Sequence, residues 1–120
     1  MHRRLIAFSV VISITTAFHA SAAENGDSEI RYLLNAVGDS GCTFIRNGQQ
    51  HQASEASSHL LMKYEQGKQW VRSAEQFIEH IASKSSVSGD PYYIECIDTP
   101  SRSTQEWLTQ RLAQHRKENE

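Results

Sequence analysis

Two cysteines constrain this chain of 120 residues more than any other feature, and Cys42 and Cys96 are the only ones it contains. Joining them would close a loop of about 55 residues, for which the chain-entropy model gives roughly 4 kcal/mol of stabilisation. A typical domain has a net stability of only about 5–15 kcal/mol. Neither cysteine has a partner at the C-x-x-C spacing of redox centres or zinc knuckles. We therefore predict one structural disulfide, with a free thiol or an intermolecular bridge as the alternatives.

The N-terminal residues 1–22 have the three-part pattern of a secretory signal peptide. Arg3 and Arg4 form a basic start, residues 5–14 form a short apolar core, and residues 20–22 (ASA) give a small-x-small cleavage signal. An uncleaved anchor helix is the alternative. Export would place both cysteines in an oxidising compartment, where disulfides persist. The sequence thus predicts a periplasmic mature chain of residues 23–120 that forms a single domain.

The charge balance argues against two classes of partner. The formal net charge is -2 and the pI is about 6.3, whereas a domain that binds nucleic acid electrostatically usually has a pI above about 9. No apolar run reaches the roughly 20 residues that a membrane-spanning helix needs. We expect no nucleic-acid partner, no membrane span after cleavage and no cofactor. The oligomeric state has no signature in the sequence.

Two segments around the cysteines have strand character. Residues 42–46 are β-branched and aromatic and end at an Asn-Gly turn, while residues 92–97 alternate between apolar and polar side chains. In an antiparallel pair, Cys42 would lie opposite Cys96, with Phe44 opposite Ile94 and Arg46 opposite Tyr92. A ribbon of two strands is marginally stable in water, so helices must cover it.

Four helices are expected, at residues 29–37, at 52–66, after Ser73 and after Ser103. Asp27 or Ser28 is the expected cap of the first, and the third and fourth begin with capping boxes, in which Gln76 and Glu106 follow the cap by three residues. The predicted inward-facing residues are Ile30, Leu33, Leu34, Val37, Ala53, Ala56, Leu60, Tyr64, Ala74, Phe77, Ile78, Ile81, Ala82, Trp107, Leu108 and Leu112. The expected fold class is a small, mainly helical α+β domain, with about four helices on a two-stranded antiparallel ribbon stapled by one disulfide.

Three segments carry a resemblance to a known family. Residues 40–48 (SGCTFIRNG), the pairs His59-Leu60 and Lys63-Tyr64, and residues 82–92 (ASKSSVSGDPY) resemble the YfeK-like family of small uncharacterised periplasmic proteins of Gram-negative bacteria. The resemblance implies a periplasmic location and a compact, mainly helical domain. The family has no established activity, so it implies no catalytic residues.

The 83–91 loop (SKSSVSGDP) is the candidate recognition segment, because it is rich in hydroxyl groups and lies between a helix and a strand. The candidate recognition residues are Arg46, Lys84, Ser85, Ser86, Ser88 and Tyr92. We expect a non-catalytic module that recognises a protein or cell-envelope partner, and an inhibitor or immunity protein against a cell-wall lytic enzyme is a special case. The plain alternative is a connector whose Ser and Asp side chains satisfy its own backbone.

The same region has features of two other chemistries. A small hydrolase could use Lys84 with Ser85, or His59, although no G-x-S-x-G signature accompanies them. His51, Glu55 and His59 share the spacing of helical metal ligands, but Lys63 on the same stripe opposes a cation, and a solvated helix face is the simpler interpretation. Arg46 either contacts an anionic group or lies over Tyr92 as a cation–π pair.

Overall fold

The computed structural model describes residues 6–15 and 22–120. Residues 6–15 have exposed side chains and belong to no helix or strand. The basic start of the expected leader, Arg3 and Arg4, and two of the three residues of its cleavage signal lie outside the described residues. In the described part of the chain, no helix is both long enough and apolar enough to cross a membrane.

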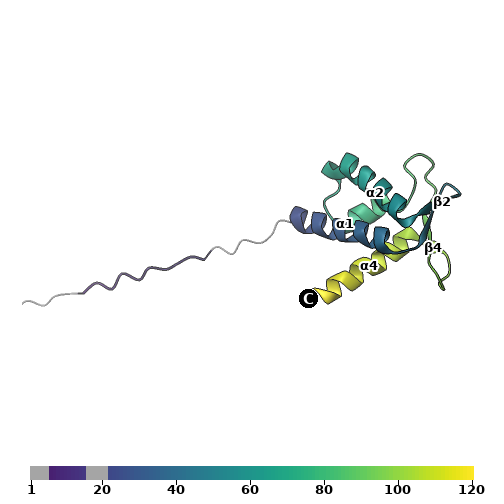
Figure 1. Cartoon of the computed structure of the whole chain (residues 1–120). Helices are drawn as coiled ribbons and strands as arrows, with labels where there is room; N and C mark the ends of the chain where they lie inside the picture. Colours follow the sequence, from purple (N-terminus) through teal and green to yellow (C-terminus); the bar gives the residue numbers. More distant parts are fainter. Residues whose placement is uncertain (1–5, 16–21) are drawn as a thin grey trace, which may run out of the picture.

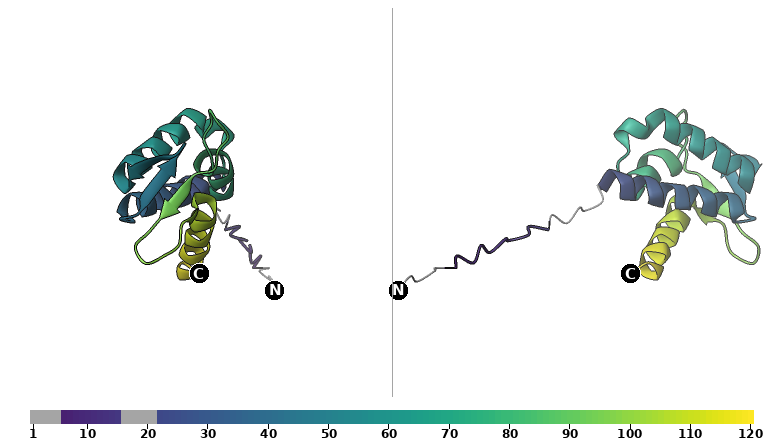
Figure 2. Two further views of the ribbon diagram at one scale, coloured as in Figure 1. Left: turned by 90° about the vertical axis from the view of Figure 1, so that its right-hand side faces the viewer. Right: turned by 60° about the vertical axis from the view of Figure 1, so that its left-hand side comes forward.

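The domain is α+β, with four α-helices and one antiparallel sheet of four strands (Figure 1). The sheet stands at one end of the molecule, and the helices extend from it (Figures 1 and 2). In chain order the elements are α1 (Ala22–Asp39), β1 (Thr43–Arg46), β2 (Gln49–Gln52), α2 (Ala53–Gly67), the 3-10 turn η1 (Lys68–Trp70), α3 (Ala74–Phe77), the π-helical segment η2 (Ile78–Ala82), β3 (Tyr93–Glu95), β4 (Arg102–Ser103) and α4 (Thr104–Glu118).

The sheet has the strand order β2-β1-β3-β4, so the expected two-stranded ribbon is its central pair. The predicted register is confirmed at its centre, where Phe44 pairs with Ile94. The ribbon prediction was incomplete because each edge strand lacks a hydrophobic signal. β2 contains only Gln and His, and β4 is two residues long. Asn47 and Gly48, with φ angles of 51° and 74°, turn the chain from β1 into β2.

The predicted disulfide is present between Cys42 and Cys96, whose Cα atoms are 4.4 Å apart. Cys42 immediately precedes β1 and Cys96 immediately follows β3. Thr43 pairs with Glu95 in the ladder, so the bridge extends the strand register by one position. It therefore links the two central strands directly at one end of the sheet.

The first helix corrects the prediction made from its caps. α1 begins at Ala22, so Asp27 and Ser28 lie inside the helix and cap nothing. The Asp27 carboxylate instead accepts a 2.6 Å hydrogen bond from the Tyr64 hydroxyl and pairs with Arg31. Gly26 marks a close approach between two elements. A Cβ atom at Gly26 would lie 2.3 Å from the carbonyl oxygen of Arg72.

The later helices start where their caps predict. The hydroxyls of Ser73 and Ser103 accept hydrogen bonds from the backbone N–H groups of Gln76 and Glu106. Gln76 departs from the capping box, because its side chain accepts from the N–H of Arg72 rather than from that of Ser73. The predicted third helix is divided into the α-helical α3 and the π-helical η2.

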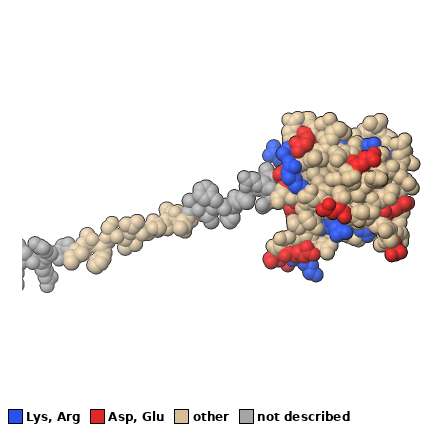
Figure 3. Space-filling view, viewed as in Figure 1, with Lys and Arg blue, Asp and Glu red and all other residues tan. Residues whose placement is uncertain are grey.

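The apolar stripes predicted from the sequence meet in one core. All the predicted inward-facing residues are buried except Ala56, which is partly buried against them. Edge-to-face contacts join Phe44 to Trp107 and Tyr64 to Phe77. At the surface, Arg116 of α4 pairs with Glu29 of α1 and Glu75 of α3, which ties three helices together. Acidic and basic side chains are interspersed on the face that Figure 3 shows.

Candidate functional site

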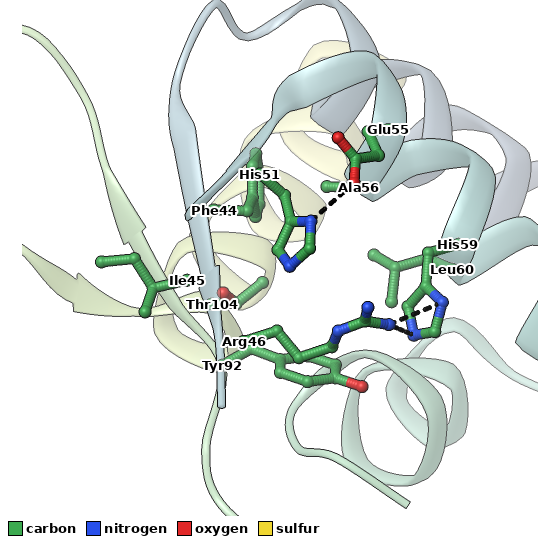
Figure 4. A pocket seen from close by; sticks show the side chains of 10 residues that line it. All are labelled: Phe44, Ile45, Arg46, His51, Glu55, Ala56, His59, Leu60, Tyr92 and Thr104. Carbon is green, nitrogen blue, oxygen red and sulfur yellow. Dashed lines mark hydrogen bonds and ion pairs between the residues drawn. The ribbon is translucent and has the colours of Figure 1, made fainter. Parts of the chain in front are cut away.

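A small pocket opens between β1, the first half of α2 and the residues that flank the sheet (Figure 4). Its volume is about 50 Å³. The lining residues are Phe44, Ile45 and Arg46 of β1, His51 of β2, Glu55, Ala56, His59 and Leu60 of α2, Tyr92 before β3 and Thr104 at the start of α4. α2 supplies four of them because positions three and four apart lie on one face of a helix. β2 runs into α2 without a linker, and this places His51 one turn before Glu55.

Two polar atoms of this lining have no hydrogen-bond partner among the described residues. They are Nε2 of His51 and Oγ1 of Thr104, and both are buried. His51 Nδ1 lies 2.7 Å from a carboxylate oxygen of Glu55, so Nδ1 carries the donated proton. In the neutral ring, Nε2 is then an acceptor. Because buried polar groups are normally paired, the pocket offers unused hydrogen-bonding capacity.

A larger groove of about 550 Å³ adjoins the pocket. The two share Arg46, His59 and Tyr92, and the groove extends from these toward the 83–91 loop. Its other lining residues are Asn47, Gln49, Met62, Lys63, Gln66, Ser85, Ser86 and Val87. Of the residues that the structure describes, Arg46 and Lys63 line the groove and no acidic side chain does. The groove is therefore suited to an anionic group.

Arg46 and His59 form a close contact at the boundary between pocket and groove. Nη1 of Arg46 lies 2.8 Å from Nδ1 and 2.6 Å from Nε2 of His59 (Figure 4). A guanidinium only donates, so the ring nitrogen that accepts must be unprotonated. Burial, followed by the charges of Arg46, Lys63 and His51, lowers the pKa of His59. The contact and the lowered pKa both favour the neutral imidazole.

Lys63 has a role that the sequence did not reveal. Its Nζ donates to the carbonyl oxygens of Ile81 at 2.6 Å and Lys84 at 3.1 Å, and it lies 3.1 Å from the Tyr92 hydroxyl. Burial and the charge of Arg46 lower its pKa to about 8. Lys63 also lies over the Tyr92 ring, 5.0 Å from the centroid. A lysine one turn beyond His59, on the same face of α2, was the available signal.

The 83–91 loop is a closed turn, and two of its serines hold it in shape. Ser85 is only 5% exposed, and its hydroxyl accepts hydrogen bonds from the backbone N–H groups of Val87 and Ser88. The Ser88 hydroxyl donates to Oδ1 of Asn47 in the β1–β2 turn. Val87, at the tip, is 97% exposed. The loop therefore presents a fixed, exposed tip beside the groove.

The structure brings together only some of the candidate recognition residues. Arg46, Ser85, Ser86 and Tyr92 line the groove, whereas Lys84 and Ser88 lie outside its lining. Lys84 is exposed and forms an isolated bridge with Pro91. No hydrogen bond joins its side chain to Ser85 in the part of the chain that the structure describes.

The residues considered as metal ligands take part in other contacts. His51 pairs with Glu55, while His59 meets Arg46. Residues 6–15 and 22–120 contain no group of three or more His, Cys, Asp or Glu side chains placed to hold a metal ion.

Comparison with known proteins identifies the family. Residues 24–116 match a family of unknown function, DUF5329. The chain belongs to this family. It is 34% identical over 91 residues to the uncharacterized protein YfeK of Salmonella typhimurium, a match that covers 75% of this chain and 76% of that protein. The YfeK-like resemblance is thus confirmed over most of the domain. No solved structure matches the chain.

Proposed function

We propose that this YfeK-like protein is an exported, non-catalytic binding module that recognises a protein or cell-envelope partner beside the 83–91 loop. The observation that carries the proposal is the pairing of a fixed loop tip with a groove that contains cations and no carboxylate. A groove of about 550 Å³ is large enough to receive a segment of a partner. An anionic group on that segment would meet Arg46.

The exposed tip of the loop favours a protein-like partner. Val87 lines the groove and Met62 faces it from α2, and both are exposed apolar side chains. Exposed apolar surface that is contiguous and rimmed by polar residues is typical of sites where a partner binds, and these two side chains line the same groove. Since Ser85 and Ser88 maintain the loop, Val87 and Ser86 are the positions where contact with a partner can be tested.

Export is the other half of the proposal. The leader pattern in residues 1–22 and the disulfide between Cys42 and Cys96 support it, because disulfides are rare in the cytosol of most organisms. An inhibitor or immunity protein against a cell-wall lytic enzyme remains a special case of this function.

The test compares two exposed aliphatic residues on different loops. Val87 lies at the tip of the 83–91 loop, and Ile97, 85% exposed, lies just beyond Cys96. Tagged Val87→Ser, Ile97→Ser and wild-type protein are each used to capture partners from a periplasmic extract, with identification by mass spectrometry. We expect a partner captured by wild type and Ile97→Ser but lost with Val87→Ser. Retention by Val87→Ser together with loss by Ile97→Ser would place recognition on the other loop.

A further inference from the structure

We propose that the pocket and the adjoining groove bind the carboxyl terminus of a peptide chain whose last residue has a small apolar side chain. This inference rests on the proposed binding function and names the chemical group that the partner presents. Three features of the site point to it, namely the guanidinium donors of Arg46 that have no partner among the described residues, an apolar recess and an unused hydrogen-bond acceptor.

The carboxylate would be held by Arg46. A guanidinium has five N–H donors in a planar fork that matches the two oxygens of a carboxylate. In Arg46 only Nη1 has a partner among the described residues. Lys63 adds a second positive charge along the groove. Glu55 is the one acidic residue of the pocket, and its carboxylate is paired with His51.

The recess beside Arg46 limits the size of the side chain that the terminal residue can have. Phe44, Ile45 and Leu60 give it an apolar wall. Its volume of about 50 Å³ compares with the roughly 10–15 Å³ that one water requires by the same measure. It therefore has room for about three to five water-sized groups, which admits the side chain of alanine or valine. A bare phosphate would leave this apolar wall without contact.

The unpartnered atoms supply the third point of contact. His51 Nε2 is an acceptor because Glu55 fixes the proton on Nδ1, and Thr104 Oγ1 lies in the same pocket. Figure 4 shows the His51 ring directed into the space between Arg46 and Thr104. In a peptide, the last amide N–H lies within two bonds of both the carboxylate carbon and the side chain. One terminal residue can therefore engage all three features at once.

The groove distinguishes a peptide from a free amino acid. The preceding residues of a peptide would continue from the pocket into the groove of about 550 Å³ that leads to Val87. A free amino acid would leave that space empty. It would also place an ammonium group close to Arg46 and Lys63, which the like charges oppose.

The experiment is isothermal titration calorimetry on the purified protein with four peptides or amino acids. The probes are acetyl-Gly-Gly-Ala with a free carboxylate, the same peptide as its C-terminal amide, acetyl-Gly-Gly-Trp with a free carboxylate, and free alanine. We expect acetyl-Gly-Gly-Ala to bind, and the affinity for each of the other three probes to be lower by a factor of about ten or more. A charge-assisted hydrogen bond, which the amide cannot form, contributes about 1.5–3 kcal/mol. Equal affinity for the amide, for free alanine or for the tryptophan peptide would overturn the proposal, as would equally effective competition by inorganic phosphate.

Variants link the binding to the residues. Arg46→Gln should weaken binding of acetyl-Gly-Gly-Ala about tenfold or more. The matched control is Arg72→Gln, because Arg72 is exposed and lines neither the pocket nor the groove. Thr104→Val keeps the shape and removes the hydroxyl, and it should weaken the free-carboxylate peptide with no gain for the amide. Thermal melts report whether each variant is folded, and if Arg46→Gln is not, the four probes decide alone.

The outcomes separate this inference from the proposed function. Suppose that wild-type protein captures a partner and Val87→Ser does not. If excess acetyl-Gly-Gly-Ala then fails to displace this partner from the wild type, the proposed function stands and the terminal-carboxylate inference is wrong. If the peptide binds as expected while capture is indifferent to Val87, the pocket is confirmed and the loop is not the recognition element.

Discussion

The Ser88 hydroxyl donates a 2.6 Å hydrogen bond to Oδ1 of Asn47, which joins the 83–91 loop to the β1–β2 turn across 41 positions of sequence. The same hydroxyl accepts from the backbone N–H of Asp90. Together with a longer hydrogen bond of 3.4 Å from Nδ2 of Asn47 to the Ser85 hydroxyl, this contact fixes the loop to the β1–β2 turn and sets the position of Val87 beside the groove.

Removing this contact should loosen the loop with little effect on the rest of the domain. Ser88→Ala deletes both hydrogen bonds, and a hydrogen bond of this kind contributes about 0.5–1.5 kcal/mol. We expect backbone amides of residues 86–90 to exchange with deuterium about tenfold faster. Ser86→Ala is the control, since Ser86 is exposed and makes no side-chain hydrogen bond in the described part of the chain. Equal exchange in both variants would contradict the assigned role of Ser88.

The disulfide should contribute a large share of the stability. Replacing Cys42 and Cys96 together with alanine should lower the free energy of unfolding by about 2–5 kcal/mol, because the unfolded chain regains the freedom of a long loop. Urea denaturation followed by far-ultraviolet circular dichroism measures the loss. Wild-type protein treated with a reductant should behave as the double variant does. An unchanged urea midpoint would show that the bridge has no structural role.

Gly26 and Gly38 provide a matched pair within α1. Gly26→Ala should destabilise the domain by about 1–3 kcal/mol, because the new Cβ would lie 2.3 Å from the carbonyl oxygen of Arg72, a backbone atom. In Gly38→Ala the new Cβ meets Oγ and Cβ of Ser57 at 3.3 and 3.4 Å, and both atoms belong to a side chain. Alanine favours a helix over glycine by up to about 1 kcal/mol, so Gly38→Ala should be close to neutral.

Thermal melts of the two variants compare these costs directly. A Gly26→Ala melting temperature at or above that of Gly38→Ala would show that α1 does not pack tightly against residues 72–73.

The lowered pKa of His59 predicts that the domain loses stability in mildly acidic solution. The folded-state pKa of this residue is lowered, so on acidification the unfolded chain takes up a proton first, near the ordinary value of about 6.5. Stability should therefore fall as the pH drops from about 6.5 toward the lower folded-state pKa, with a slope of at most about 1.4 kcal/mol per pH unit for one proton. Above about 6.5 both states are neutral, and this contribution to the slope disappears.

Urea denaturation at a series of pH values measures the slope, and His59→Gln should reduce it. A nuclear magnetic resonance titration of the His59 ring gives the folded-state pKa independently. A slope that is the same in His59→Gln and wild type would assign the pH dependence to other groups.

The core of the fold could be predicted from the sequence because its signals are local and periodic. The stripe on α1, the hydroxyl caps at Ser73 and Ser103, and the alternation around Ile94 each report a buried face within a few residues. The start of α1 could not be read in this way. Its first turns are polar and contain Gly26. A glycine is required there because the backbone of Arg72, far along the chain, lies too close for a Cβ atom.

The site was harder to predict than the fold because it depends on contacts between elements. The sequence singled out Arg46, Tyr92 and the stripe of His51, Glu55 and His59, and the structure gathers them around one pocket. The sequence placed Lys63 on the same face of α2 as His59, but it did not show that Lys63 would be half-buried against the loop, or that the Thr104 hydroxyl would have no partner among the described residues. Both facts follow from where α2 and α4 meet the sheet.

The starting point of α1 bears on the proposed removal of the leader. The cleavage site expected from the leader pattern lies between residues 22 and 23, and α1 begins at Ala22. A protease binds its substrate in an extended conformation, which a segment already folded into a helical turn does not have. If the proposed cleavage takes place, the cut at this bond has to precede the winding of the first turn of α1, and the new amino terminus can form that turn only afterwards.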